Sequence, residues 1–572
     1  MPNFFTDNKD LVFQFENLDL KYITKLTEHD YRDAGQFDYA PKDYEEAKEN
    51  FRKVLEIAGN IAANIIAPLA PEVDKEGAHF KDGVVTYAKG TQEALKRLTQ
   101  ADLMGFTLPR KYGGLNMPIS IYTMSIEMIS RADASLMNLY GLQDIAETIN
   151  KFGSEEQKNE FLPKFSNGSS TGAMVLTEPD AGSDLQAVNL KAYQDEDGNW
   201  KLNGVKRFIT NGSGDILLVL ARSEPGTIDG RGLSMFVCYG DNTVIVRRIE
   251  DKLGIHGSPT CELQFNDTPC QLVGKRKLGL IKYVMDLMNG ARLGVSAQAM
   301  GISQAAYEEA FSYAKAREQF GKAIIEIPAV KNLLIDMRTT LETNRTLLYA
   351  TARFVDLRDK LAEYIEHLKA DCKPAGDEMA MQKKYTKIAA LLTPMCKLIL
   401  TESANKLTYD SLQIHGGTGY MREFNVERLA RDARITNIYE GTSQLQVVAA
   451  IGGVMNDLFA ETFDEHEKKE YKGQLSDLAQ HLKTIRKTFL DCLEFIQEKQ
   501  DKDFKDAASK DIVEMYSFLV TGYLILDEAE INEKKLHIAK RYILRSLSES
   551  HQKSDAIRFG LFSDLKNSAD II

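Results

Sequence analysis

The sequence predicts an α+β protein in which a β domain lies between two helical regions. Two changes in the spacing of apolar residues support this prediction. Apolar positions recur three and four residues apart over about residues 44–168, and short runs rich in β-branched and aromatic residues replace them after Thr171. The helical spacing returns near Ile281 and continues to the last residue. The expected domains are an N-terminal extension (1–43), an N-terminal helical domain (44–170), a middle antiparallel β domain (171–280), a C-terminal helical domain (281–455) with an insertion (355–384), and an additional C-terminal helical region (456–572).

Length and composition are those of an ordinary globular protein. The chain has 572 residues, of which 43% are hydrophobic and 27% charged. At roughly 100 to 200 residues per domain, this length corresponds to about three to five units. A net charge of -12 argues against nucleic-acid binding, because a duplex-binding surface needs clustered Lys and Arg.

Cysteine usage indicates a reducing compartment, and the N-terminus and the short apolar runs bear on localisation. The six cysteines are far apart and include no CxxC pair, so buried thiols are favoured over a metal site and no metal is expected. The first residues carry no basic segment followed by an apolar core. Apolar runs such as residues 216–221 and 447–451 are far shorter than the roughly 18 residues of a spanning helix. We therefore expect a cytoplasmic protein without a transmembrane segment.

In the first helical domain, a local signal marks one helix start. Ser154 followed by Gln157 is typical of a capping box, in which each side chain bonds the other residue's backbone N–H. A helix starting there would carry Phe161 and Leu162 into the core.

In the β domain, turn signals separate the short apolar runs. Asp197-Gly198 and Asn203-Gly204 are expected turns, and residues 205–209, 216–221 and 233–239 are expected strands. The segment 195–199 (DEDGN) resembles the start of a calcium loop, but it lacks the distal glutamate, so a hairpin turn is favoured.

Two segments of the second helical region look like additions to it. Residues 355–384 are highly charged and are broken by Lys-Pro-Ala-Gly at 373–376, which suggests a surface hairpin or lid. After Asn456, an apolar stripe predicts a helix packed on the main body or on a partner subunit, because its opposite face mixes acids and bases and does not favour a membrane. The stripe consists of Leu475, Leu478, Leu482, Ile485, Phe489, Leu493 and Ile496.

The run 438–446 (IYEGTSQLQ) contains the candidate catalytic residue, Glu440. Glycine beside the carboxylate allows close approach to a ligand, and a helix opening at Thr442 or Ser443 offers backbone N–H groups to an anion. This pattern suits a proton-abstracting base against a phosphate-bearing cofactor. Taken alone, the same letters are also typical of an ordinary helix start.

Three further segments, with the Glu440 run, resemble the acyl-CoA dehydrogenase family in that family's order. They are residues 176–184 (LTEPDAGSD), 317–321 (REQFG), and 412–420 (LQIHGGTGY) followed by Arg431-Asp432. The resemblance extends from about Thr91 to Met455. It implies an N-terminal helical domain, a middle β domain and a C-terminal four-helix bundle, with FAD bound in extended form at a subunit interface.

The resemblance also implies site residues. The cofactor-binding positions are Met174, Leu176, Thr177, Gly182, Ser183, Phe208, Ile209, Thr210, Arg317, Gln319, Phe320, Gln413, Gly416, Gly417, Thr442 and Gln444. The family usually has tryptophan where Phe208 stands, so stacking is kept and the indole N–H is lost. Ile327-Pro328 replaces a His-Gln pair found in many members, which changes contacts at the adenine end. Gly-Gly-Thr-Gly at 416–419 is not a GxGxxG turn, so nicotinamide is not implied.

For the substrate, the resemblance implies Ser183, Arg292, Tyr439 and Gly441 as acyl-CoA contacts. Ala291 stands where a subgroup of the family has an alternative glutamate, which leaves Glu440 as the base. The implied reaction is FAD-dependent oxidation of a fatty acyl-CoA to the trans-2-enoyl-CoA, as in fatty acid beta-oxidation: Glu440 takes the α-proton and flavin N5 the β-hydride.

The implied partners are an electron-transferring flavoprotein and further copies of the chain, as a homodimer or homotetramer. Two alternatives remain open: an acyl-CoA oxidase that uses oxygen, and a non-catalytic flavin- or CoA-binding scaffold.

Overall fold

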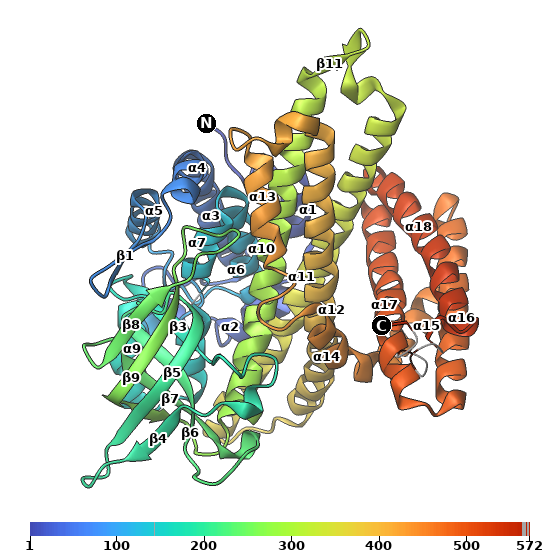
Figure 1. Cartoon of the computed structure of the whole chain (residues 1–572). Helices are drawn as coiled ribbons and strands as arrows, with labels where there is room; N and C mark the ends of the chain where they lie inside the picture. The colour runs from blue at the N-terminus through green and yellow to red at the C-terminus, as the bar shows by residue number, and fades with distance from the viewer. Residues whose placement is uncertain (142, 563–564, 566–567, 569–570) are drawn as a thin grey trace. The chain divides into compact units, whose positions relative to one another are not determined.

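The computed structural model describes residues 1–572 except 142, 563–564, 566–567 and 569–570 (Figure 1). The chain divides into two compact units, which are described separately. Unit 1 contains residues 1–305 and 417–436, and unit 2 contains residues 306–416 and 437–572.

Unit 1 begins with helices. They are α1 (Lys9–Asn17), α2 (Lys21–Thr27), α3 (Tyr44–Ile61), α4 (Ala67–Glu76), α5 (Lys89–Gln100), α6 (Ile119–Ala132), α7 (Ala134–Tyr140), α8 (Gln143–Phe152) and α9 (Glu155–Ser166). The predicted capping box starts α9: Gln157 N donates to Ser154 Oγ at 3.3 Å, and Ser154 N donates to Gln157 Oε1 at 3.1 Å. Phe161 and Leu162 are buried, as expected.

Two features of the helical region were not expected from the sequence. A short hairpin of β1 (His79–Lys81) and β2 (Val84–Thr86) lies between α4 and α5. Helices α3 and α4 are continuous through a π-helical turn at Ala62–Ile66. By length and composition alone, this stretch of residues 44–76 could cross a membrane, the one such candidate in the described part of the chain. Its Phe51 and Leu55 are buried within unit 1.

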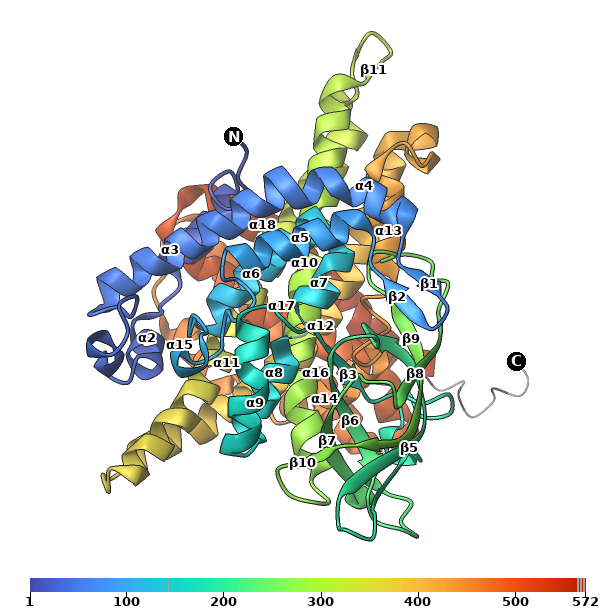
Figure 2. The ribbon, with the colours of Figure 1, turned by 90° about the vertical axis from the view of Figure 1, so that its left-hand side faces the viewer.

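The β domain of unit 1 is an eight-stranded sheet (Figure 2). Its strands are β3 (Gly172–Val175), β4 (Lys191–Gln194), β5 (Trp200–Thr210), β6 (Ile216–Arg222), β7 (Leu233–Tyr239), β8 (Val244–Ile249), β9 (Thr260–Pro269) and β10 (Gln271–Val273). The order is β10-β7-β6-β4-β5-β9-β8, and β3 pairs with β6. The sheet is mainly antiparallel, as predicted, but β3 runs parallel to β6.

One predicted turn of the β domain is wrong and another is confirmed. Asn203 and Gly204 lie inside β5, where the pairing with β9 shifts between Leu202 and Gly204. The glycine, at φ +139°, forms a bulge within a long strand and not a turn between two strands. Residues 195–199 form the expected hairpin turn, because β4 and β5 pair from Gln194 opposite Trp200.

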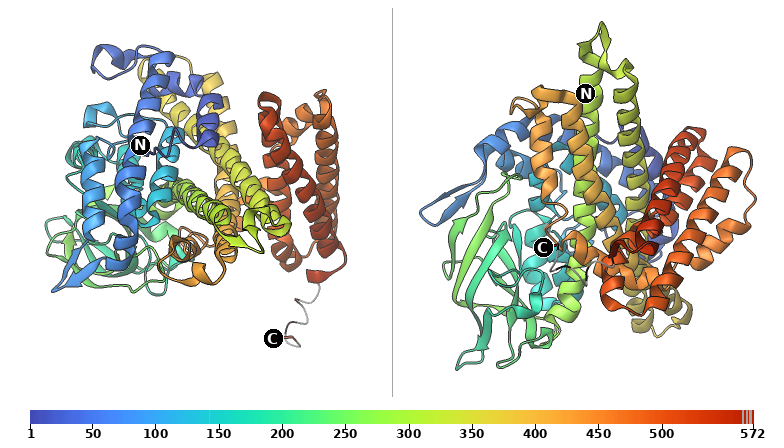
Figure 3. Two further views of the ribbon diagram at one scale, coloured as in Figure 1. Left: turned by 90° about the horizontal axis from the view of Figure 1, so that it is seen from above. Right: turned by 45° about the vertical axis from the view of Figure 1, so that its right-hand side comes forward.

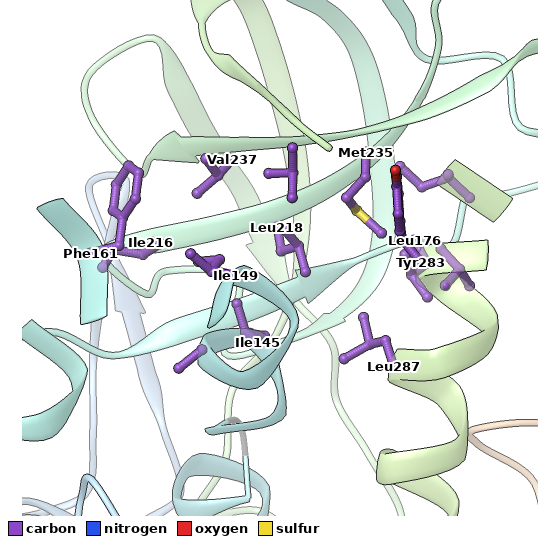
Figure 4. Close-up of a cluster of buried hydrophobic side chains, with 14 of the residues drawn as sticks. Ile145, Ile149, Phe161, Leu176, Ile216, Leu218, Met235, Val237, Tyr283 and Leu287 are labelled. Atoms are coloured by element: carbon purple, nitrogen blue, oxygen red, sulfur yellow. The ribbon is translucent and has the colours of Figure 1, made fainter. Parts of the chain in front are cut away.

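One core cluster of unit 1 lies between the sheet and helices that pack on one of its faces (Figure 4). Ile216 and Leu218 of β6 point toward Ile145 and Ile149 of α8. Leu217, the residue between them, belongs to a second core cluster. Strand β6 is therefore buried on both faces, which explains its continuous apolar run.

Unit 2 is helical. It contains the second part of α10 (Met285–Ala316), which begins in unit 1, and α11 (Pro328–Ala370), α12 (Gly376–His415), α14 (Ser443–Met455), α15 (Ala460–Lys468), α16 (Gln474–Lys499), α17 (Lys502–Ile531) and α18 (Glu533–Arg558). The strands β11 (Glu318–Gln319) and β12 (Lys322–Ala323) form a small hairpin between α10 and α11. Helix α13 (Asn425–Arg434) belongs to unit 1.

The additional C-terminal region is helical and buries its apolar stripe. Helices α16, α17 and α18 run side by side (Figure 3), and α17 also packs against α11 and α14. Every stripe residue is buried except Leu475, which is half-buried. Lys535 of α18, 5% exposed, forms ion pairs with Glu528 of α17 at 3.1 Å and with Glu342 of α11 at 2.9 Å. This region therefore packs on the main helical body of its own unit.

The charged segment 355–384 is the connected end of the helices α11 and α12. Its turn covers residues 371–375, between two continuous helices. Val355 and Leu361 are buried, so only the outer part of the segment is a surface hairpin.

Candidate active site

The first part of the candidate site is the Thr177 loop, residues 176–183, which follows β3. Lys206 of β5 is fully buried and contacts this loop. Its Nζ donates to the Leu176 carbonyl at 2.6 Å and pairs with Glu178 Oε1 at 3.0 Å. Glu178 also accepts the backbone N–H groups of Asn189 (2.8 Å) and Leu190 (2.9 Å). Burial lowers the pKa of Lys206 to about 8, against the attraction of Glu178.

A bulge in β5 contains Phe208, next to a residue whose backbone bonds the Thr177 loop. Arg207 N donates to the Thr177 carbonyl at 3.0 Å. Phe208 has φ +61°, in the bulge between Lys206 and Ile209, and its side chain is 51% exposed. A left-handed aromatic residue stores strain, and such strain concentrates at functional sites. Ile209 is buried in the sheet, and Thr210 ends the strand.

The Thr177 loop is open around Gly182. A Cβ built on Gly182 would meet only Thr177 Cγ2, at 4.0 Å. Gly182 and Ser183 are both exposed, and Thr177 is half-buried. An open glycine, a threonine hydroxyl and an exposed aromatic ring at adjoining strand ends fit a flavin, which needs close backbone approach and a stacking surface.

The second part is the Glu440 loop, residues 437–443, which precedes α14. Glu440 has φ +54° and Gly441 has φ +91°, so two consecutive residues are left-handed. Gln446 Nε2 donates to the carbonyls of Glu440 (3.1 Å) and Gly441 (2.7 Å), and Lys397 Nζ donates to the Gly441 carbonyl at 2.7 Å. A Cβ at position 441 would lie 2.8 Å from Gln446 Nε2. This position therefore favours glycine for its conformation, and a larger residue would also have to displace the end of the Gln446 side chain.

Both ends of the Glu440 loop are held by a second carboxylate. Glu402 of α12 accepts from Asn437 Nδ2 at 3.2 Å and from Ser443 Oγ. Ser443 N also donates to the Asn437 carbonyl at 3.2 Å. Helix α14 starts at Ser443 after Thr442, as the sequence predicted.

Several other predicted cofactor residues of unit 2 are on its surface. Gln319 and Phe320 lie in the β11–β12 hairpin, where Phe320 is 92% exposed. Arg317, Gln413, Gly416 and Gln444 are also exposed. A Cβ on Gly416 would meet no atom within 4 Å. These residues offer exposed backbone and exposed side chains to a ligand.

The predicted site residues are divided between the two units. Met174, Leu176, Thr177, Gly182, Ser183, Phe208, Ile209, Thr210, Arg292 and Gly417 belong to unit 1, and Arg317, Gln319, Phe320, Gln413, Gly416, Tyr439, Glu440, Gly441, Thr442 and Gln444 belong to unit 2. Arg292 of α10 is buried, and its Nη1 donates to Asn289 Oδ1 at 3.1 Å. Within unit 1 the structure brings the Thr177 loop and Phe208 together; within unit 2 it groups residues 439–444.

Arg431 and Asp432, part of the third sequence motif, have structural contacts within unit 1. Arg431 forms ion pairs with Asp74 of α4 at 2.6 Å and with Glu427 at 2.7 Å. His256 Nδ1 lies 2.9 Å from Asp74 Oδ1, and this contact raises the pKa of His256 to about 9. Asp432 accepts from Ile255 N at 2.6 Å, and burial raises the pKa of its carboxyl to about 6. These residues fix α13 to α4 and to the loop 252–258.

Residues that hold the two loops were missed in the sequence. Glu178 and Gln446 lie inside the family motifs, and Lys206, Lys397 and Glu402 lie outside them. None of the five is among the predicted site residues. Lys397 did carry a signal, because it interrupts the apolar run 391–400. A lysine there must either be exposed or bury its charge against a partner.

Family models cover most of the chain. The acyl-CoA dehydrogenase N-terminal, middle and C-terminal domain models match residues 48–169, 173–268 and 281–451. A fourth model, described as acyl-CoA dehydrogenase C terminal, matches residues 456–559.

Individual proteins show the same similarity. The chain is 32% identical over 516 residues to 3-methylmercaptopropionyl-CoA dehydrogenase of Ruegeria pomeroyi, covering 83% of this chain and 84% of that protein. It is 33% identical to acryloyl-CoA reductase (NADH) of Anaerotignum propionicum, covering 70% and 93%. Among solved structures, an acyl-CoA dehydrogenase of Bacillus anthracis complexed with FAD has the same fold, with a TM-score of 0.75 at 22% identity over 89% of this chain and 88% of that one.

Proposed function

The chain belongs to the acyl-CoA dehydrogenase family of FAD-dependent oxidoreductases, and we propose that it oxidises a fatty acyl-CoA thioester to the trans-2-enoyl-CoA with Glu440 as the catalytic base. The observation that carries the proposal is the Glu440 loop. Its carboxylate-bearing residue has a strained φ of +54°, and side chains of two helices hold the backbone there. Strain that is maintained by buried donors is typical of a site whose geometry matters for chemistry.

The chain's own residues bind the reactants and move one proton. The Glu440 carboxylate removes the α-proton of the thioester, and the backbone N–H of the same residue donates to the thioester carbonyl oxygen, where negative charge develops. When bound, FAD supplies the hydride acceptor at N5. The Thr177 loop and Phe208 would hold its ring, and Ser183, Arg317, Gln413 and the glycines 416 and 417 would hold its phosphates. Arg292, Tyr439 and Gly441, with Ser183, bind the acyl-CoA.

The reduced flavin must pass its electrons to an acceptor. We propose an electron-transferring flavoprotein as the electron acceptor, a homodimer or homotetramer as the assembly, and fatty acid beta-oxidation in the cytoplasm as the setting. The relative from Anaerotignum propionicum is named acryloyl-CoA reductase (NADH), so reduction of an enoyl-CoA is the alternative direction for this chain.

A direct test is anaerobic reduction of the flavin. We expect the oxidised-flavin absorbance of the purified holoprotein to bleach when a suitable straight, branched or aromatic acyl-CoA is added. Glu440→Gln keeps the size of the side chain but cannot accept the proton, so bleaching should slow by about 100- to 10,000-fold while FAD stays bound. Glu366→Gln, at a 73% exposed glutamate of α11, is the control and should bleach at the wild-type rate.

Each result separates the proposal from its alternatives. Wild-type speed in Glu440→Gln would place the base elsewhere. No bleaching by any acyl-CoA in the panel would indicate a non-catalytic flavin or CoA scaffold. Fast reoxidation of the bleached enzyme by oxygen, with stoichiometric peroxide, would identify an oxidase.

A further inference from the structure

A buried lysine faces the backbone of the Glu440 loop. Lys397 of α12 is fully buried, and its neighbours Met395, Cys396 and Leu398 are also buried. Its Nζ donates to the Gly441 carbonyl at 2.7 Å. Removing an ammonium from water costs several kcal/mol before compensation, whereas an apolar side chain would fill the same volume without that cost. A buried cation here therefore needs an explanation beyond packing.

A second buried donor acts on the same backbone. Gln446 of α14 is fully buried, and its Nε2 donates to the carbonyls of both Glu440 and Gly441. The Gly441 carbonyl thus receives two hydrogen bonds, one from each of two helices. Two donors on one carbonyl fix the direction of that peptide more firmly than either alone.

The hydrogen bonds determine how the peptides of the loop are turned. All described peptide bonds are trans, so each N–H points opposite to the carbonyl of the same peptide. With the carbonyls of Glu440 and Gly441 directed to Gln446 and Lys397, the N–H groups of Gly441 and Thr442 face the other way. The left-handed φ of Glu440 is unfavourable for a residue with a Cβ, and it persists only where surrounding contacts enforce it.

We propose that Lys397 and Gln446 are positioning residues for catalysis: they hold residues 440 and 441 in the left-handed conformation that sets the direction of the Glu440 carboxylate. This inference rests on the proposed function of Glu440 as the base. Loss of either donor lets the loop relax, so the carboxylate spends less time in its reactive position. The rate of flavin reduction then falls, while the acyl-CoA, bound by other groups, keeps its affinity.

The kinetic experiment uses Lys397→Met and Gln446→Met in the FAD-loaded full chain. Both keep the length of an unbranched side chain and remove the donor. We expect anaerobic flavin reduction at saturating acyl-CoA to slow by about 10- to 100-fold in each, because a misplacement of about 1 Å can cost some 100-fold. The half-saturating acyl-CoA concentration should change by less than about threefold. Because both act on one carbonyl, the double variant should lose less than the product of the single losses.

A second measurement does not depend on flavin chemistry. Hydrogen–deuterium exchange of a peptide covering residues 437–446 should accelerate in both variants while the rest of the chain is unchanged. Thr393→Val is the matched control, because Thr393 is fully buried on α12 one turn before Lys397. It should leave the rate of flavin reduction and the exchange of residues 437–446 at wild-type values.

The kinetic and exchange results together test the positioning role of Lys397 and Gln446. Wild-type reduction rates with unchanged exchange in both variants would overturn the inference, and so would equal losses of rate, affinity and melting temperature, which describe a purely structural role. If Lys397→Met does not fold, Gln446→Met alone decides. If the wild type is not reduced by any acyl-CoA, the proposed function fails, while the exchange result still shows whether the two donors hold the loop.

Discussion

The Thr177 loop and the Glu440 loop are both held by a fully buried lysine, but in different ways. Lys206 of β5 pairs with Glu178, and that carboxylate is anchored in turn by the backbone N–H groups of Asn189 and Leu190. Lys397 of α12 donates directly to the Gly441 carbonyl. A charge pair that is bonded to several backbone groups maintains the fold around it, and a donor on a loop carbonyl fixes the orientation of that peptide. We therefore expect loss of the Lys206–Glu178 pair to affect mainly stability, and loss of the Lys397 donor to affect mainly the rate of flavin reduction.

The largest effect is expected when the charge pair of the first loop is broken. Glu178→Ala leaves the Lys206 ammonium buried without this carboxylate, and loss of one partner of a buried pair typically costs about 3–5 kcal/mol of unfolding free energy. Lys206→Met should cost clearly less, because Glu178 keeps its two backbone donors. Denaturant unfolding of the two variants measures the difference. An equal loss in both would show that the pair is not what holds the loop.

A smaller effect is expected when one glycine in each loop is replaced by alanine. Gly441→Ala should cost about 1–3 kcal/mol of strain, since the residue has φ +91° and the new Cβ would lie 2.8 Å from Gln446 Nε2. Gly182→Ala should stay within about 0.5 kcal/mol, since its Cβ meets only Thr177 Cγ2 at 4.0 Å. Thermal melting measures the stability of both variants, and the flavin content after purification measures the effect of Gly182→Ala on cofactor binding. Equal melting of the two variants would contradict the expected rigidity of the Glu440 loop.

The most gradual effect is a pH dependence that belongs to Lys206. Its pKa is lowered to about 8 in the folded chain, against an ordinary value of 10.5. Between these values the unfolded chain binds more protons at this site, so the free energy of unfolding rises with pH. Relative to Lys206→Met, the wild type should gain up to about 1 kcal/mol per pH unit from about pH 8 to 10. A stability difference that stays flat over this range would mean that the folded lysine titrates at its ordinary pKa.

Local signals in the sequence were enough for the order of the domains, the α9 capping box, the hairpin turn at 195–199 and the start of α14. Each depends on residues within one or two turns of chain, so neighbouring letters carry the information. The same local reasoning failed at Asn203-Gly204. A turn signal there was overridden by pairing with β9, a strand some 60 residues later in the chain, and the glycine became a bulge.

Family motifs supplied the candidate site residues, including Glu440, but not what holds them. Lys206 meets Glu178, and Lys397 meets Gly441, only after a strand or a helix has been packed against a distant loop. The residues that neighbour a lysine in the sequence do not differ between a lysine whose ammonium group is exposed to water and one whose ammonium group bonds a buried carbonyl. Only the tertiary structure decides which, because the cost of burying the charge depends on partners that packing brings from elsewhere in the chain.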